Sequence, residues 1–331
     1  MVAIESLASD ERGARIVLAS VTEPDDAFTG RLVARRGAVE TLRLLGGDGP
    51  IRGADIAEAM LWRERLVPRL DADAISRVLG ASERLGLRVL VPGEADWPSA
   101  LGVLGERAPL ALWIKGDPGI LRQTRPRDAV TFTGARAATS YGEHVAQSLA
   151  NDIAGQGGVI VSGGAYGIDG AAHRAALASG GRTVAVLAGG LDRPYPTGHR
   201  ELLDQVGREG ALVSELPPGS TPTRWRFLAR NRLLAAVSAA TVVVEAGYRS
   251  GSLHVAAQAA GLGRPVGAVP GPVTSAASAG CHRLLREGTA RVVTDIADLC
   301  ALTSPSPAAA GVQFSRETPT RARPGRSGLS R

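Results

Sequence analysis

The stretch VIVSGGAYGIDGAAHRAAL, residues 159–177, contains the pattern that decides the fold. Its first four residues are mostly β-branched and apolar on both faces of an extended chain, as in a buried strand of a parallel sheet. Glycines then predict a turn, and the segment from about Asp169 to Ser179 predicts a helix. A buried strand, a turn and a helix in succession form the repeating unit of α/β domains.

The same alternation extends to both sides of this stretch. Helices are expected at about 140–156, near 198–207 and near 252–261, between further apolar strands. These strand candidates are AVTFT (129–133), TVAVLA (183–188), ALVSE (211–215), TVVVEA (241–246) and PVGAV (265–269). The pattern predicts a doubly wound, mostly parallel, Rossmann-like α/β sheet.

Composition and hydrophobic periodicity divide the chain into three parts. Residues 1–86 form a small helical N-terminal module, in which apolar residues recur at helical spacing from about Phe28. Residues 87–302 form the α/β domain, with extra strands expected at 88–91 and 110–114. Residues 303–331 are rich in Ser, Pro, Gly and Arg and are predicted to be disordered.

Charge is concentrated in places and is weak overall. The net charge of the 331 residues is +6, but five arginines and one glutamate from Thr303 onward contribute +4 of it. The remainder carries only about +2, so any nucleic-acid surface must be a local patch.

Cys281 and Cys300 are the only cysteines, which indicates a reducing, cytoplasmic compartment and excludes a disulfide framework. Acidic residues interrupt the N-terminus before any apolar signal could form, and no run is long enough to span a membrane. The five histidines lack metal-ligand spacing, so neither a metal nor another cofactor is predicted.

Three strand ends lead into turns rich in glycine or hydroxyl residues. They are TGARAATSYG (133–142), SGGAYGIDGAAH (162–173) and EAGYRSGS (245–252). The carboxyl ends of parallel strands share one edge, so the three turns are expected to face one cleft. Each opens a helix, and free N–H groups there would accept the phosphate of a ligand.

The stretch RWRFLARNR, residues 224–232, places four arginines among two aromatic residues just before the strand candidate TVVVEA (241–246). On a helical wheel the arginines scatter and form no polar stripe, so a simple solvated helix face explains them poorly. Arginine forks match phosphates, and aromatic faces accept any base. We therefore expect this stretch to form part of the strand-edge site, on phosphates or ordering the loops that hold them.

From about Arg88 to Leu302 the sequence resembles the DNA-processing protein A (DprA/Smf) family. The resemblance rests on TGARAATSYG, VSGGAYGIDGAAHRAAL, GGLDRPYP, SELPPG, FLARNRLLAAVSAATVVVEA, SGSLHVAAQA and AVPGP, which occur in the family's order. It implies an extended Rossmann domain that binds single-stranded DNA without sequence preference and forms a homodimer. It also implies that the protein helps load RecA recombinase onto DNA covered by single-strand binding protein, in homologous recombination during DNA-mediated transformation.

The resemblance also implies which residues bind DNA. The positions that match the family's motifs, with the hydroxyl of the first turn, are Arg136, Ser140, Ser162, Gly163, Arg230, Asn231, Arg232, Gly251 and Ser252. The chain departs from the pattern after PYP, where Thr197, Gly198 and His199 replace the usual lysine and asparagine. Many relatives end in a winged-helix-like domain, for which the 29 residues after Leu302 are too few and too polar.

The alternative is an enzyme, a phosphoribohydrolase-type hydrolase acting on nucleotides. Asp169 and His173 are four residues apart on one predicted helix and could form an acid–base pair. The bland interpretation is an aspartate that caps free N–H groups and holds the histidine. It is favoured, because no second carboxylate or arginine completes a hydrolase motif, and no catalytic residue is predicted.

Overall fold

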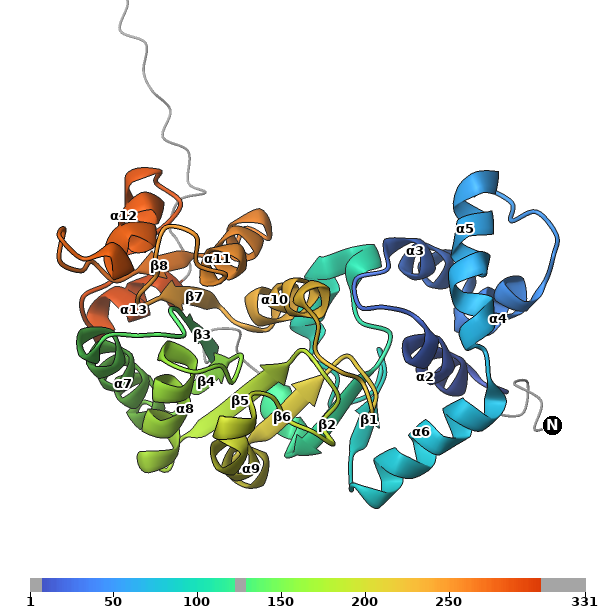
Figure 1. Cartoon of the computed structure of the whole chain (residues 1–331), viewed down its shortest axis with the longest axis horizontal. Helices are drawn as coiled ribbons and strands as arrows, with labels where there is room; N and C mark the ends of the chain where they lie inside the picture. Colours follow the sequence, from blue (N-terminus) through green and yellow to red (C-terminus); the bar gives the residue numbers. More distant parts are fainter. Residues whose placement is uncertain (1–7, 123–128, 305–331) are drawn as a thin grey trace, which may run out of the picture.

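The computed structural model describes residues 8–122 and 129–304, and its centre is one twisted sheet (Figure 1). Among these residues the sheet has nine strands in the order β1-β2-β6-β5-β4-β3-β7-β8-β9. All neighbours from β6 to β9 are parallel, whereas β2 pairs antiparallel with both β1 and β6. The predicted doubly wound, mostly parallel sheet is confirmed.

The strands follow the predicted apolar runs, and each ends where polar or glycine-rich sequence begins. Their bounds are β1 Arg88–Leu90, β2 Leu112–Gly116, β3 Ala129–Thr133, β4 Val159–Ser162, β5 Arg182–Leu187, β6 Ala211–Ser214, β7 Ala240–Val243, β8 Val266–Ala268 and β9 Arg291–Val292. The chain runs outward from β3 to β6 and then returns to place β7 on the other side of β3. In folds of this kind, ligands bind outside the carboxyl ends of the strands, near such a reversal of strand order.

Two layers of helices cover the sheet and bury its aliphatic faces. One layer contains α7 Ser140–Gly155, α8 Ile168–Ala178, α9 Arg200–Glu209 and α13 Ile296–Thr303. The opposite layer contains the 3₁₀ segment η2 Ser99–Arg107, α10 Arg224–Val237, α11 Ser252–Gly261 and α12 Ala279–Arg286. RWRFLARNR is therefore the first part of α10.

The N-terminal helices have a core of their own. They are α2 Glu11–Val21, α3 Ala27–Arg36, α4 Ala38–Gly46, α5 Ile56–Leu66 and α6 Ala72–Arg84. Trp62 is fully buried among them, and its indole N–H donates to the Thr29 hydroxyl at 2.8 Å. The predicted domain boundary at residue 86 falls in the link between α6 and β1, and the division into domains stays a prediction.

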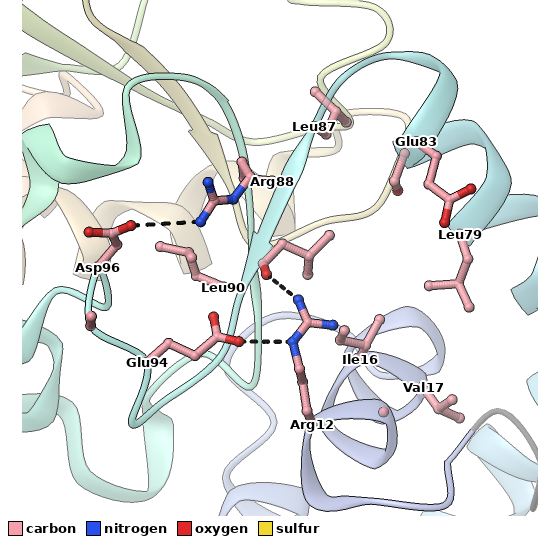
Figure 2. A pocket seen from close by; sticks show the side chains of 14 residues that line it. Arg12, Ile16, Val17, Leu79, Glu83, Leu87, Arg88, Leu90, Glu94 and Asp96 are labelled. Carbon is pink, nitrogen blue, oxygen red and sulfur yellow. Dashed lines mark hydrogen bonds and ion pairs between the residues drawn. The ribbon is translucent and has the colours of Figure 1, made fainter.

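The helices also attach directly to the edge of the sheet (Figure 2). Ile16 of α2 packs against the apolar side of β1 and β2. Arg12 donates to the carbonyl of Val89 at 2.8 Å and pairs with Glu94 at 2.8 Å. Because Arg12 covers the edge strand, β1 does not present a free row of backbone groups there.

The predicted disordered segment, residues 303–331, begins at Thr303, the last residue of α13, and residues 305–331 lie outside those that the structure describes. Within the described part, no helix is long and apolar enough to cross a membrane.

Candidate functional site

A shallow pocket lies at the carboxyl edge of the central strands. We call it the strand-edge pocket and define it by the residues that line it, which are Arg136, Gly163, Ala165, Tyr166, Tyr195, Pro196 and Phe227. They come from the turns after β3 and β4, the loop after β5, and the first half of α10. The fold thus brings together two of the predicted residues, Arg136 and Gly163, that are far apart in sequence.

Arg136 is an exposed cation held in place by an aromatic ring. Its guanidinium carbon lies 5.1 Å from the centre of the Phe227 ring, and Phe227 in turn contacts Tyr195 edge to face at 5.9 Å. No carboxylate in residues 8–122 or 129–304 forms an ion pair with Arg136. The ring orders the side chain without neutralising it, so its charge remains available to an anion.

Arg230 lies beneath this pair and is buried. It donates to the carbonyl oxygens of Gly163, at 3.2 Å, and of Val186, so it ties the ends of β4 and β5 together. Burial lowers the pKa of Arg230 to about 10, partly offset by the charge of Asp169, and it stays protonated at neutral pH. A Cβ at Gly163 would lie 2.5 Å from the Arg230 guanidinium, which explains the glycine there.

Internal carboxylates already occupy three backbone amides of the first two turns, so the expectation of free N–H groups does not hold for these three. In the second turn, Asp169 accepts from the N–H groups of Gly163 and Ala165 at 3.1 and 3.3 Å. In the first turn, Glu245 accepts from the N–H and hydroxyl groups of Thr139 at 2.8 and 2.7 Å. Two internal carboxylates take the positions that a phosphate would have taken.

Of the two serines predicted to face a ligand in these turns, one is buried and the other is exposed. Ser162 is buried and donates to the carbonyl of Phe132 at 2.7 Å, so it links β4 to β3. Ser140 is exposed at the start of α7. Sequence alone could not separate these two serines, because both follow strand ends.

The third turn does not line the strand-edge pocket, contrary to the expectation that all three turns face one cleft. Gly251 is exposed, whereas Ser252 is buried and shares a 2.8 Å hydrogen bond with Ser250. Glu245, at the start of this turn, reaches across to Thr139 instead. The Glu245 side chain therefore holds the third turn against the first turn.

Four tyrosines border the same edge and are exposed. Tyr141, Tyr166, Tyr195 and Tyr248 have exposed fractions of 42, 45, 45 and 58%. Tyr166 is fixed by the segment that departs from the family's pattern. His199 packs against its ring at 4.7 Å, and the Gly198 N–H donates to its hydroxyl at 3.2 Å. The substituted residues therefore orient an aromatic face.

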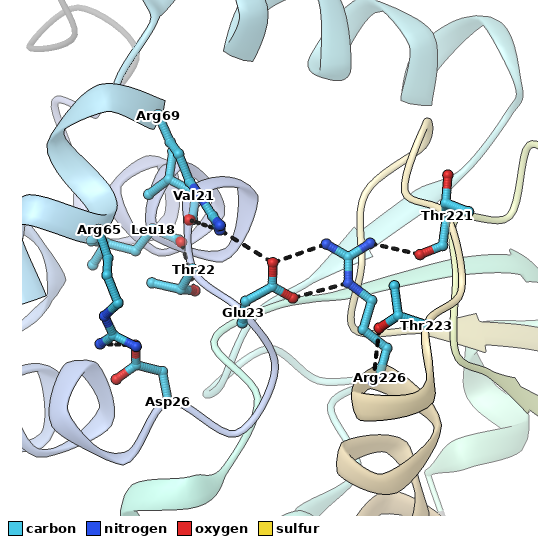
Figure 3. A network of polar contacts seen from close by, with 10 residues as sticks. All are labelled: Leu18, Val21, Thr22, Glu23, Asp26, Arg65, Arg69, Thr221, Thr223 and Arg226. Atoms are coloured by element: carbon cyan, nitrogen blue, oxygen red, sulfur yellow. Dashed lines mark hydrogen bonds and ion pairs between the residues drawn. The ribbon is translucent and has the colours of Figure 1, made fainter.

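Two other arginines of α10, Arg226 and Arg232, reach the loop of residues 23–26, which we call the acidic loop, and Figure 3 shows the contact of Arg226. Arg226 donates to both carboxylate oxygens of Glu23, at 2.9 and 3.0 Å, and Arg69 of the helical module reaches the same carboxylate at 3.2 Å. Burial raises the pKa of Glu23, but hydrogen bonds and charge from Arg226 and Arg69 outweigh it and lower the pKa.

Arg232 is the most enclosed member of this contact, with 1% of its side chain exposed. It forms two 2.7 Å hydrogen bonds to Glu215 and lies 3.3 Å from Asp25 of the acidic loop. Asp25 adopts φ +69°, the only positive φ among the described non-glycine residues. Arg232 therefore cannot reach a ligand, and its neighbour Asn231 is buried as well.

The acid–base pair of Asp169 and His173, which the hydrolase alternative would need, does not form. His173 is fully buried, and its Nδ1 shares a 2.7 Å hydrogen bond with Thr183. Burial lowers the pKa of His173 to about 3 and raises the pKa of Asp169. Asp169 accepts hydrogen bonds from backbone N–H groups, as the structural interpretation predicts. It forms no hydrogen bond with His173, which bonds to Thr183 instead, so that part of the interpretation is wrong. Among the described residues no group of three acidic, histidine or cysteine side chains could hold a metal ion.

Comparison with known proteins gives consistent matches. The family model described as DNA recombination-mediator protein A matches residues 88–304. A putative DNA processing protein DprA of Mycobacterium tuberculosis is 51% identical over 265 residues, which cover 76% of this chain and 67% of the relative.

Two solved structures share the fold. The X-ray structure of DNA processing protein A from Streptococcus pneumoniae superimposes with a TM-score of 0.71 at 31% identity, over 88% of this chain and 97% of that one. A Helicobacter pylori DNA processing protein A, studied for its single-stranded DNA binding mode, gives a TM-score of 0.58 at 29% identity, over 66% of this chain and 96% of that one.

Proposed function

Because this chain belongs to the DNA recombination-mediator protein A (DprA/Smf) family, we propose that it binds single-stranded DNA, without base preference, along the strand-edge pocket. Its relatives are named as DNA processing proteins, and the Helicobacter pylori structure describes single-stranded DNA binding for that protein. The hydrolase alternative is not favoured, since Asp169 and His173 are buried and separately bonded.

The observation that carries the proposal is the environment of Arg136. Most arginines of the adjoining α10 face carboxylates or carbonyls, whereas Arg136 is exposed, rests on Phe227 and has no carboxylate partner in the described structure. An ordered, unneutralised guanidinium is suited to a phosphate of the DNA backbone. Tyr166 and Tyr195 lie in the same pocket with exposed rings, on which any base can stack.

The remaining predicted residues receive different roles in this proposal. Gly163 and the buried Arg230 shape the floor of the pocket and add positive potential from below. The exposed Ser140 and Gly251 extend the DNA path along the same edge. Ser162, Asn231, Arg232 and Ser252 support the fold around the site, because all four are buried.

The wider role is proposed from the family. The protein would act in the cytoplasm as a homodimer that assists RecA loading on DNA covered by single-strand binding protein, in recombination and DNA-mediated transformation. It would bind DNA without catalysing a reaction on it. The pocket supports this view, because its exposed groups are cations and aromatic rings that suit binding.

A salt titration tests the proposal. Full-length protein is titrated with single-stranded and double-stranded oligonucleotides of mixed sequence at several salt concentrations. We expect tighter binding of the single strand, similar affinities for unrelated sequences, and an affinity that falls as salt rises. Binding that prefers duplex, or that does not change with salt, would refute it.

A further inference from the structure

A second groove rich in arginine lies on the helical module, at the end of the molecule away from α12 and α13 (Figure 1). Four arginines line it, Arg31, Arg35 and Arg36 from α3 and Arg52 from the segment before α5, and we call it the basic groove. Phe28, Leu32, Gly53, Ala54, Asp55 and Glu58 complete the lining. None of these residues belongs to the strand-edge pocket or to the acidic loop.

The acidic residues in the groove are already engaged. Glu58 pairs with Arg31 at 2.6 Å, and Asp55 caps α5 by accepting from the Glu58 N–H at 2.9 Å. Arg36 donates to the carbonyl of Arg52 at 2.7 Å, which fixes the guanidinium without neutralising it. Arg35, Arg36 and Arg52 form no ion pair with a described carboxylate, and the four arginines of the groove outnumber its two carboxylates, Asp55 and Glu58.

Two helix ends also lie at the groove. The eleven-residue helix α5 begins at its edge, but Asp55 caps this end and Glu58 lies in its first turn, so these two carboxylates offset the positive end of the helix dipole. Arg35 and Arg36 occupy the last turn of α3, where they offset the negative end of that helix. Compensation of the α3 dipole would by itself explain two arginines at the end of α3. It would not explain why Arg36 points across the groove to the carbonyl of Arg52.

The ligand class follows from what the groove lacks. Its one aromatic residue, Phe28, is 6% exposed and stacks with Trp62 inside the module, so no ring is free for a base. We propose that the basic groove is a second nucleic-acid site that contacts phosphates only and therefore accepts single-stranded and double-stranded DNA alike. The choice of DNA as ligand rests on the proposed function, since an acidic protein would present similar charges.

The test compares two double variants of the full-length protein. Arg35→Ala/Arg52→Ala removes two free cations from the groove, and Arg77→Ala/Arg84→Ala removes two exposed arginines from α6 of the same module. Each is made alone and together with Arg136→Ala, and thermal melting verifies the fold. Binding to single-stranded and duplex oligonucleotides is measured against salt.

We expect the groove variant to weaken duplex binding at low salt by roughly tenfold or more and to reduce the salt slope by about 2, one for each phosphate contact. The factor for the single strand should be similar, and the loss should persist in the Arg136→Ala background. The α6 variant should retain the parental salt slope.

Equal behaviour of the two double variants, a loss confined to single-stranded DNA, or unchanged DNA binding would overturn the inference. The last result would point to an acidic protein as the ligand. If the parent failed to prefer single-stranded DNA, the proposed function would fail, whereas a duplex loss specific to the groove variant would still support the groove.

Discussion

The strand-edge pocket and the contact with the acidic loop both use arginines of α10, but they treat the charge differently. Arg226 and Arg232 form ion pairs with Glu23, Asp25 and Glu215, so carboxylates of the same molecule neutralise their positive charge. At the pocket, Arg230 donates hydrogen bonds to carbonyl oxygens and lies near the Phe227 ring and the charge of Asp169, and Arg136 rests on the Phe227 ring without an ion pair to a described carboxylate. The difference teaches that the facing group, and not the arginine, decides whether a cation holds the fold or remains available to a ligand.

The largest expected effect follows from breaking the enclosed pair. Arg232→Met leaves the carboxylate of Glu215, which is only 12% exposed, without its arginine, whereas Asp25 keeps its two 2.6 Å hydrogen bonds from Arg107. The free energy of unfolding should fall by about 3–5 kcal/mol. Urea denaturation measures it, and any folded protein should bind single-stranded DNA with parental affinity. A stable variant with weak DNA binding would contradict the structural role.

A second effect should be large for binding and small for stability. Arg136→Ala removes an exposed cation that bonds to no described carboxylate, so the melting temperature should stay within about 1 °C of the parent, a shift typical of neutral surface changes. Affinity for single-stranded DNA should fall by about 1.5–3 kcal/mol, roughly 10- to 100-fold. Arg77→Ala, an exposed arginine on α6, is the matched control and should change neither quantity.

Phe227→Leu sharpens the comparison by removing the ring beneath Arg136 while keeping an apolar side chain. Single-stranded DNA binding should weaken by about 0.5–1 kcal/mol, because the guanidinium loses its support. In a double-mutant cycle with Arg136→Ala, the two losses should not add, since the ring acts through the arginine. Fully additive losses would mean that Phe227 contacts DNA independently.

The smallest effect concerns pH at the acidic loop. The pKa of Glu23 is lowered in the fold, so its contacts with Arg226 and Arg69 stabilise the protein above its ordinary pKa of 4.5 and weaken as the pH falls below it. Glu23→Gln should therefore cost less than about 1 kcal/mol at pH 7, because the pair is partly exposed.

The stability difference between parent and Glu23→Gln should shrink toward zero as the pH is lowered below 4.5, which denaturation at pH 7, 5 and 3.5 would measure. A difference that grew in acid would contradict the sign of the pKa shift.

Several features of this protein could be predicted from the sequence because they depend on residues close together along the chain. The apolar runs of β3 to β8 and four of the five α-helices between them were predicted to within a few residues, since burial on both faces leaves a local pattern, whereas α10 was not predicted as a helix. The positions of Arg136 and Gly163 at strand ends placed them at one edge, because parallel strands share their direction.

Other predictions were wrong or incomplete where a distant residue decided the outcome. Glu245 and Asp169 occupy the turn amides that seemed open to a phosphate, and Glu245 does so from another strand end. The acidic loop is visible in the sequence as Glu23, Asp25 and Asp26, yet nothing local indicates that it meets α10, about two hundred residues further along the chain.

The residue pattern along the chain was therefore enough to predict the α/β sheet, the family and the sheet edge at which we propose the DNA site. Only the tertiary structure decided which arginines are free, because a guanidinium has the same charge and local propensity wherever it stands. Its availability depends on whether folding brings a carboxylate, a carbonyl or a ring within a few ångströms, and that choice divides Arg232, Arg230 and Arg136 into three different roles.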